Sequence, residues 1–272
     1  MESIGRIGLI GGGNMAEAFI KGLQNGGVAA DNLMVSEPLE ARRAVLAERY
    51  KIRTTDDNRN VVKSCDAIIL AFKPQIVGEV VPGLADAYSD DKLLISILAG
   101  VVTRRIEGYF TGSPRVVRAM PNTPALVGQA ATALCPGQNA GPEDLDKARK
   151  LFETLGTVVV VRENQMDAVT GVSGSGPGYI FTVIEALADG GVQEGLSRDT
   201  ALSLAVQTVL GSAMLMRESG EHPAVLRDKV CSPAGTTISA IRVLEEKGLR
   251  STLMEAVAQA TKRSRELGKA SG

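Results

Sequence analysis

The stretch Ile7-Gly-Leu-Ile-Gly-Gly-Gly-Asn-Met-Ala16 decides the fold of this chain. Its first four residues are mostly apolar and predict a buried strand, and the three glycines that follow predict a sharp turn. Apolar and small residues at helical spacing then run from Asn14 to Gly22. A strand, a glycine turn and a helix in this order give Gly11-x-Gly13-x-x-Ala16, a pattern typical of dinucleotide sites. The alternative for so short a motif is an ordinary turn between a strand and a helix.

Each small residue of this pattern has a physical reason. Gly11 would make the tight turn, Gly13 would let a pyrophosphate approach the backbone, and Ala16 would let the helix pack closely on the strand. The unpaired N–H groups of the first helical turn would then face the phosphates. We expect this segment to contact a cofactor through Ile10, Gly11, Gly13, Asn14, Met15 and Ala16.

Composition excludes several classes of protein. The 272 residues carry a net charge of −1 and only 3% aromatic residues, which argues against a nucleic-acid or anionic membrane partner. Three widely spaced cysteines and one histidine predict no metal site and fit reduced thiols in a cytoplasmic protein. We expect neither a signal peptide nor a membrane span, because the N-terminus leads directly into a strand.

The first half of the chain alternates between apolar strands and helices, which predicts a parallel, doubly wound α/β sheet over residues 1–163. Further strands are expected at residues 32–36, 52–56, 65–72, 93–98, 115–120, 131–134 and 157–161, and further helices at 41–49, 77–88, 104–110 and 143–155.

The carboxyl ends of these strands predict the ligand crevice, because open α/β sheets bind ligands there. Ser36 and Glu37 end the second strand, where the adenosine ribose is read. Glu37 could accept from a 2′-hydroxyl, which would favour NAD. Arg42 and Arg43 could instead meet a 2′-phosphate, which would favour NADP, or could simply form a solvated helix face. The sequence leaves the choice of cofactor open.

The second half, residues 164–272, predicts an all-helical domain. Helices are expected at residues 165–170, 179–190, 200–217, 223–229, 237–246 and 251–267. The segment from Thr200 to Arg217 is apolar almost all round, which predicts a helix buried on every side. About a hundred residues can hardly bury such a helix alone, so we expect intertwined subunits. The alternative is a central helix inside one protomer.

Two small-residue segments precede predicted helices: Ser173-Gly-Ser-Gly-Pro-Gly178 and Cys231-Ser-Pro-Ala-Gly-Thr-Thr237. We expect both to be loops that present hydroxyls and free N–H groups to an anionic substrate. The alternative is that their Ser and Thr residues only cap the helices.

These motifs together resemble the pyrroline-5-carboxylate reductase family, from one end of the chain to the other. The resemblance is carried by residues 10–16, Lys73-Pro74-Gln75, Pro121-Asn-Thr-Pro124, residues 167–177 and, most specifically, residues 230–245. Two departures are Ala234, where the family usually has glycine, and the pair Gly171-Val172.

The resemblance implies an N-terminal Rossmann domain and an all-α C-terminal dimerisation domain, in homodimers that assemble further into decamers. It implies NADPH as cofactor, with NADH as the alternative, and a substrate site completed by the partner's helical domain. By matching motif, the cofactor would also meet Asn58 on the adenosine side, Ala71, Lys73 and Pro74 on the ribose–nicotinamide side, and Pro121, Asn122 and Thr123 around the nicotinamide. The substrate would meet Val230, Ser232, Gly235, Thr236 and Thr237, with Thr170 nearby.

The implied reaction is hydride transfer to the C=N bond of 1-pyrroline-5-carboxylate, giving L-proline in the last step of proline biosynthesis. Such an imine can take its proton from solvent, which suits a chain without paired carboxylates or a catalytic histidine constellation. Thr237 and Thr170 are the candidate catalytic residues, and we expect His222 to be structural or solvated. One alternative is a β-hydroxyacid dehydrogenase, although Lys229, Lys247, Lys262 and Lys269 all lie among charged neighbours. The other is a non-catalytic NADP sensor.

Overall fold

The computed structural model describes residues 4–270 and divides into two compact units. Of the described residues, one unit comprises 4–175 together with 258–270, and the other comprises 176–257. The expected domain boundary between residues 163 and 164 marks the end of the strands, whereas the first unit continues to residue 175. That division into domains stays a prediction.

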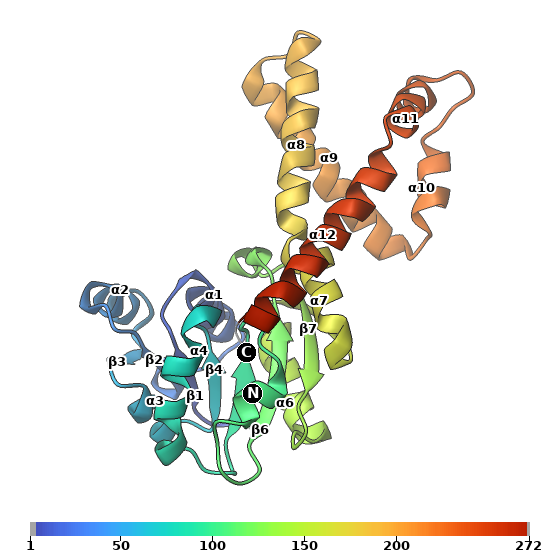
Figure 1. Ribbon diagram of the computed structural model, residues 1–272. Helices are drawn as coiled ribbons and strands as arrows, with labels where there is room; N and C mark the ends of the chain where they lie inside the picture. The colour runs from blue at the N-terminus through green and yellow to red at the C-terminus, as the bar shows by residue number, and fades with distance from the viewer. Residues whose placement is uncertain (1–3, 271–272) are drawn as a thin grey trace. The chain divides into compact units, whose positions relative to one another are not determined.

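The first unit is built on one eight-stranded sheet in the order β3-β2-β1-β4-β5-β6-β7-β8 (Figure 1). Its strands are β1 (Ile7–Ile10), β2 (Leu33–Ser36), β3 (Arg53–Thr55), β4 (Ala67–Leu70), β5 (Leu93–Ser96), β6 (Arg115–Met120), β7 (Ala130–Pro136) and β8 (Gly156–Val160). Neighbouring strands run parallel except β6 and β7. The predicted doubly wound sheet is therefore confirmed, with one antiparallel pairing in addition.

The antiparallel pairing follows from a short connection between β6 and β7. Residues 121–129 hold only a 3₁₀ turn, Thr123–Val127, and a left-handed glycine, Gly128, at φ 72°. A parallel strand needs a crossover of about a dozen residues or more, so the chain can only turn back beside β6.

Both faces of the sheet are buried at its central strands β1, β4 and β5, because alternate strand residues enter two different cores. Leu9 and Ile69 lie in one core with Phe19 and Phe152, whose rings meet edge to face at 4.8 Å. Ile68 lies in the other core. The flanking helices are α1 (Asn14–Asn25), α2 (Glu40–Tyr50) and α6 (Pro142–Glu153) on the first face, and α3 (Asn58–Ser64), α4 (Val77–Val80) and α5 (Thr103–Glu107) on the second.

Two predicted elements differ in the structure. The single helix expected over residues 77–88 is α4 followed by a 3₁₀ helix, Pro82–Ala87. Pro82 has no N–H group, so it cannot continue the α-helical ladder. The loop expected over residues 173–178 is wrong. After α7 (Met166–Val169) the chain forms a π-helical turn, Thr170–Gly174, which leads almost directly into α8.

The second unit is helical, as expected. It contains α8 (Gly176–Gln193), α9 (Arg198–Ser219), α10 (Pro223–Lys229), α11 (Thr236–Glu246) and the start of α12 (Leu249–Ala270), whose later residues belong to the first unit. α8 and α9 pack together through Ala188, Ala201 and Ala205.

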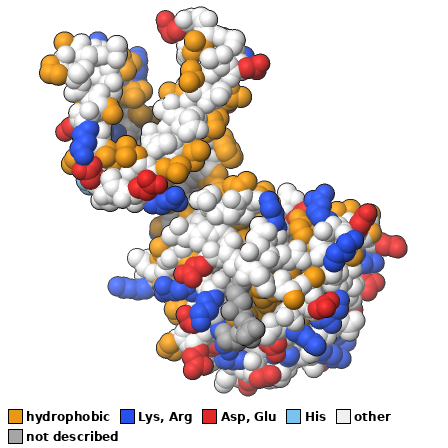
Figure 2. Space-filling model, turned by 180° about the vertical axis from the view of Figure 1, so that it is seen from behind, with side chains coloured by type: hydrophobic (Ala, Val, Ile, Leu, Met, Phe, Trp, Pro, Cys, Tyr) orange, Lys and Arg blue, Asp and Glu red, His pale blue; other side chains and the backbone are white. Residues whose placement is uncertain are grey.

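The apolar surface of α9 is largely uncovered within one chain. Ala201 and Ala205 are buried, whereas Leu204 and Leu215 are 55% and 56% exposed. Hydrophobic side chains also line the other helices of this unit (Figure 2). The alternative of a central helix inside one protomer is therefore wrong, and so large an apolar surface marks an interaction site. Among the described helices, α9 is also the one long and apolar enough to span a membrane, a length and composition that the core helices of soluble proteins share.

Candidate active site

The glycine turn after β1 is fastened to the two strands on either side. The Gly11 N–H donates to the Ser36 carbonyl at 2.8 Å, and the Ala71 N–H donates to the Ile10 carbonyl at 2.8 Å. Gly11 has a φ of 102°, and a Cβ there would lie 2.5 Å from the Ala71 carbonyl oxygen. Only glycine fits this position, which ties the carboxyl ends of β1, β2 and β4 together.

The N-terminus of α1 is built to hold an anion. Gly13 is the N-cap residue, and no side chain in the described part of the chain caps the helix. A Cβ on Gly13 would meet no described atom within 4 Å, while Ala16 is fully buried against the strand. The first-turn N–H groups of Asn14, Met15 and Ala16 lack partners within the helix. Together with the open space at Gly13, they fit the pyrophosphate of a dinucleotide.

The end of β2 lies beside this turn. The Glu37 carboxylate accepts from the Gly12 N–H at 2.8 Å and from the Leu39 N–H at 3.1 Å. The Ser36 hydroxyl donates to Asn58 Oδ1 at 2.6 Å. Ser36, Glu37 and Asn58, which the sequence assigns to the adenosine half of the cofactor, thus lie close together at one edge of the sheet.

Arg42 is held by an acidic residue of α1. Its Nε donates to the Gly12 carbonyl at 2.6 Å, and its Nη2 contacts Glu17 at 2.6 Å. Arg49 and the Tyr50 hydroxyl also donate to Glu17, at 2.6 and 2.8 Å. Burial alone would raise the pKa of Glu17, but the hydrogen bonds from Arg42, Tyr50 and Arg49 outweigh it and lower that pKa below its ordinary value. Arg42 is therefore not part of a solvated helix face, because both the Gly12 carbonyl and Glu17 hold its side chain.

The end of β4 supplies Ala71, Lys73 and Pro74. Pro74 begins a 3₁₀ turn, Pro74–Ile76, and Lys73 immediately before it is exposed. Ala71 adjoins the glycine turn through the contacts described above. The structure therefore brings these three residues to the same edge as Gly11.

Asn122, at the end of β6, joins three segments. Its Nδ2 donates to the Ser173 carbonyl and its Oδ1 accepts from the Ala131 N–H, both at 3.0 Å. Pro121 and Thr123 flank it in the chain. These bonds fix the end of β6 to β7 and to the π-helical turn, a positioning role that the sequence motif did not predict.

Thr170 begins that π-helical turn. Its hydroxyl donates to the Met166 carbonyl at 3.0 Å, and the Ser175 N–H donates to the Thr170 carbonyl at 2.8 Å, five residues back. The hydroxyl proton of Thr170 is thus used inside the helix, which leaves its oxygen free only to accept. Its catalytic assignment stays a prediction.

Two side-chain pairs hold the chain around α7 in place, one through Glu163 and one through Asp167. Arg118, an arginine within the apolar strand β6, is nearly fully buried and pairs with Glu163. Glu163 also contacts Cys135. The pKa of the Cys135 thiol is raised to about 12, mainly by burial and, to a smaller extent, by the negative charge of Glu163. The Ser264 hydroxyl donates to Asp167 at 2.7 Å, which ties α12 to α7. The sequence offers a signal for the first pair, because an arginine within an apolar strand needs a buried partner. The Asp167–Ser264 contact spans 97 residues and leaves no local pattern in the sequence.

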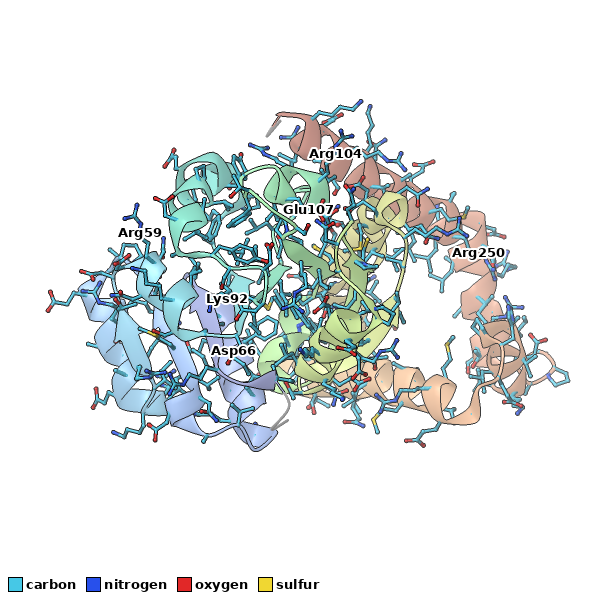
Figure 3. All side chains as sticks on the ribbon, turned by 90° about the horizontal axis from the view of Figure 1, so that it is seen from below. Arg59, Asp66, Lys92, Arg104, Glu107 and Arg250 are labelled. Carbon is cyan, nitrogen blue, oxygen red and sulfur yellow. The ribbon has the colours of Figure 1, made fainter. Side chains whose placement is uncertain are left out.

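The opposite, amino-terminal edge of the sheet has hydrogen bonds of its own and a cavity. Asp66 accepts from the Arg6 N–H at 2.7 Å, and the Lys92 ammonium donates to the Cys65 carbonyl at 3.0 Å. The side chains of Asp66 and Lys92 are labelled in Figure 3. A cavity of about 550 Å³ at this edge is lined by Arg6, Gly27 and Asp66 among others. It lies away from the carboxyl edge, where doubly wound sheets bind ligands, so we do not assign it to the site.

The second unit contains the other predicted segment, between α10 and α11. Gly235 is the N-cap of α11, and none of the side chains that the structure describes caps this helix. The Gly235 N–H donates to the Ser232 carbonyl at 3.0 Å, and a Cβ on Gly235 would lie 2.2 Å from Ser232 Oγ. Thr236 and Thr237 therefore open a helix whose first N–H groups can receive a carboxylate.

Ala234 adopts the left-handed conformation, with φ 57°. This explains why glycine is expected here from the family resemblance, because a Cβ is strained in that conformation.

His222 has a structural role, as expected. Its Nδ1 accepts from the Ala224 N–H at 3.2 Å, which caps α10 ahead of Pro223. Nearby, the exposed Lys229 pairs with Glu221 at 2.6 Å.

Comparisons with known proteins agree with this architecture. Residues 163–267 match the family model "Pyrroline-5-carboxylate reductase dimerisation", and residues 6–100 match "NADP oxidoreductase coenzyme F420-dependent". The pyrroline-5-carboxylate reductase of Methanosarcina acetivorans is 48% identical over 97% of this chain and 98% of its own. Among solved structures, the enzyme from Coxiella burnetii gives a TM-score of 0.92 at 37% identity, covering 97% of this chain and 98% of its own.

A second solved structure bears on the cofactor. The Plasmodium falciparum enzyme, solved with NADP bound, gives a TM-score of 0.88 at 32% identity, covering 98% of this chain and 99% of its own. The dimerisation match indicates that the chain forms oligomers. With these relatives and this site, the chain belongs to the pyrroline-5-carboxylate reductase family.

Proposed function

We propose that this protein reduces 1-pyrroline-5-carboxylate to L-proline with NAD(P)H, in the last step of proline biosynthesis. The observation that carries the proposal is the uncapped N-terminus of α1, with open space at Gly13, in a chain of this family. That arrangement fits a dinucleotide, and the family specifies the imine.

The cofactor would lie along the carboxyl edge of the sheet. The N–H groups of residues 14–16 would hold the pyrophosphate, and the segment at Ser36, Glu37 and Asn58 would hold the adenosine half. Ala71, Lys73 and Pro74 would meet the second ribose, and Pro121, Asn122 and Thr123 the nicotinamide. The bonds of Asn122 to two other segments support this placement, because they hold the end of β6 rigid.

The substrate carboxylate would bind at the N-terminus of α11. No described side chain caps the N-terminus of α11, so the N–H groups of Thr236 and Thr237 are open to a ligand, and Ser232 lies next to Gly235. Val230, 62% exposed, would contact the ring. The Thr237 hydroxyl would donate a charge-assisted hydrogen bond to the substrate.

The reduced nicotinamide supplies the hydride. The chain's own contribution is orientation: a carboxylate clamp fixes the ring so that its C=N carbon faces the nicotinamide. Solvent protonates the imine nitrogen, so a dedicated acid is not required. Thr170 would contribute as an acceptor of hydrogen bonds, since its hydroxyl already donates its proton to the Met166 carbonyl.

The assembly we propose is an intertwined homodimer that groups further into decamers, with each substrate site completed by the partner. The exposed apolar face of α9 supports it, because two copies would cover it mutually. We expect a cytoplasmic protein without nucleic-acid or membrane partners. Light scattering should give a mass at an even multiple of 28.5 kDa; a monomer would contradict this assembly.

The function is tested by following nicotinamide oxidation with 1-pyrroline-5-carboxylate, and nicotinamide reduction with small 3-hydroxyacids. The proposal predicts that the imine is turned over and that the 3-hydroxyacids are not. Turnover with a 3-hydroxyacid would support a β-hydroxyacid dehydrogenase, and binding without turnover would support a sensor.

A further inference from the structure

We propose that Glu37 makes this protein selective for NAD(H) over NADP(H). The inference rests on the proposed function, since it concerns the same cofactor site, and it settles a choice that the sequence alone leaves open.

Glu37 is fixed at the position where the adenosine ribose is read. Its Oε2 accepts from the Gly12 N–H at 2.8 Å and its Oε1 accepts from the Leu39 N–H at 3.1 Å. Gly12 belongs to the turn that precedes the pyrophosphate site at Gly13. A Cβ on Gly12 would lie 3.1 Å from the Glu37 side chain, so backbone and carboxylate are in close contact. The carboxylate is therefore part of the glycine turn itself and not a mobile surface group.

The chemistry of this carboxylate matches a diol. A carboxylate offers about four acceptor positions, and the two backbone N–H groups use two of them. The remaining positions can accept from the 2′- and 3′-hydroxyls of a ribose. A 2′-phosphate has no proton to donate when fully ionised, and it brings up to two negative charges against a negative group. Glu37 would then have to leave the turn and release the Gly12 N–H.

The neighbouring arginines are already engaged. Arg42 donates to the Gly12 carbonyl and pairs with Glu17 at 2.6 Å. Its side chain is 25% exposed and that of Glu17 is 15% exposed, so the pair is sheltered from solvent. If Arg42 turned to a phosphate, it would give up both contacts.

Arg43 is held against the backbone of the same segment. Its Nη1 donates to the carbonyls of Glu37 and Pro38, at 2.7 and 2.8 Å. Those bonds brace the loop that carries Glu37. The two arginines that favour NADP in the sequence thus support the position of Glu37 in the structure.

The test is calorimetric titration of the purified protein with NAD⁺ and with NADP⁺, for the wild type, Glu37→Gln and Glu37→Ser. Both substitutions remove the charge; glutamine keeps an acceptor for the Gly12 N–H, and serine makes room. Glu40→Gln is the matched control, because Glu40 is an exposed acid on the adjacent turn. Thermal melting shows that each variant is folded.

We expect the wild type to bind NAD⁺ about tenfold or more tightly than NADP⁺, the range of a charge-assisted hydrogen bond. Both Glu37 variants should lower this ratio by about tenfold or more, and Glu40→Gln should leave it unchanged. Equal wild-type affinities, or a ratio that Glu37 variants do not change, would overturn the selectivity alone. Binding of neither nucleotide would overturn the proposed function.

Discussion

Ala234→Gly should stabilise this protein, although glycine substitutions usually do the opposite. Ala234 lies just before the N-cap of α11 at φ 57°, where a non-glycine residue costs about 1–2 kcal/mol. Glycine gains more freedom in the unfolded chain, which offsets about 0.5–1 kcal/mol of that relief. The net expectation is a gain in the free energy of unfolding that lies between about 0 and 1.5 kcal/mol, with a central value of about 0.8 kcal/mol.

Urea unfolding at one fixed protein concentration measures this difference, because an oligomer's stability depends on concentration. Ala240→Gly is the matched control: Ala240 lies within α11, where the same change should cost about 1 kcal/mol. The two alanine-to-glycine changes should therefore move the midpoint in opposite directions. If Ala234→Gly destabilises the protein as much as Ala240→Gly does, the strain assigned to residue 234 is absent.

Three further predictions concern the N-termini of α11 and α1 and the hydrogen bonds that Glu17 accepts from Arg42, Arg49 and Tyr50. Thr237→Ala should lower kcat/KM for the imine by an amount corresponding to about 1.5–3 kcal/mol, the loss of one charge-assisted hydrogen bond; unchanged steady-state kinetics would remove Thr237 from the mechanism. Gly13→Val should abolish nucleotide binding in calorimetry while the oligomer mass stays the same, because its side chain would fill the open space over α1; retained affinity would refute the crevice. The pKa of Glu17 is lowered from 4.5, so its contribution to stability is present above that pH and is lost as pH falls through the lower, folded value. Acid unfolding of Glu17→Gln should accordingly show a shallower loss of stability below about pH 4.5 than the wild type, and parallel curves would contradict the assignment.

Local pattern was sufficient for most of the sheet. Strands β1, β4 and β5 are apolar runs buried on both faces, and each ends at a turn of glycine, proline or small residues, so their positions follow from periodicity and turn chemistry. The antiparallel direction of β7 follows from the short connection between β6 and β7. The pattern of apolar residues predicts that a strand is present but not the direction in which it runs. The sequence predicted a loop at residues 173–178 because Gly and Ser are poor α-helix formers. The structure has a π-helical turn there instead, since Asn122 and Met120 contact this segment and hold it helical.

The composition of the cofactor site was predictable, but its internal bonds were not. Gly11, Gly13 and Ala16 carry their roles in residue type alone, since each depends on having a small side chain. Whether Glu37 or Arg42 reads the ribose depends on partners 25 residues away in the chain, Gly12 and Glu17. Such contacts leave no periodic signal, which is why the sequence left the cofactor open.

The most direct test of the central claim follows the hydride itself. The protein is incubated with 1-pyrroline-5-carboxylate and a nicotinamide cofactor deuterated at its hydride-donating carbon, and the product is analysed by mass spectrometry and NMR. We expect L-proline that carries one deuterium on the δ-carbon, the former C=N carbon, in equal amount to the oxidised cofactor. Cofactor that stays reduced, or proline without the label, would contradict the account.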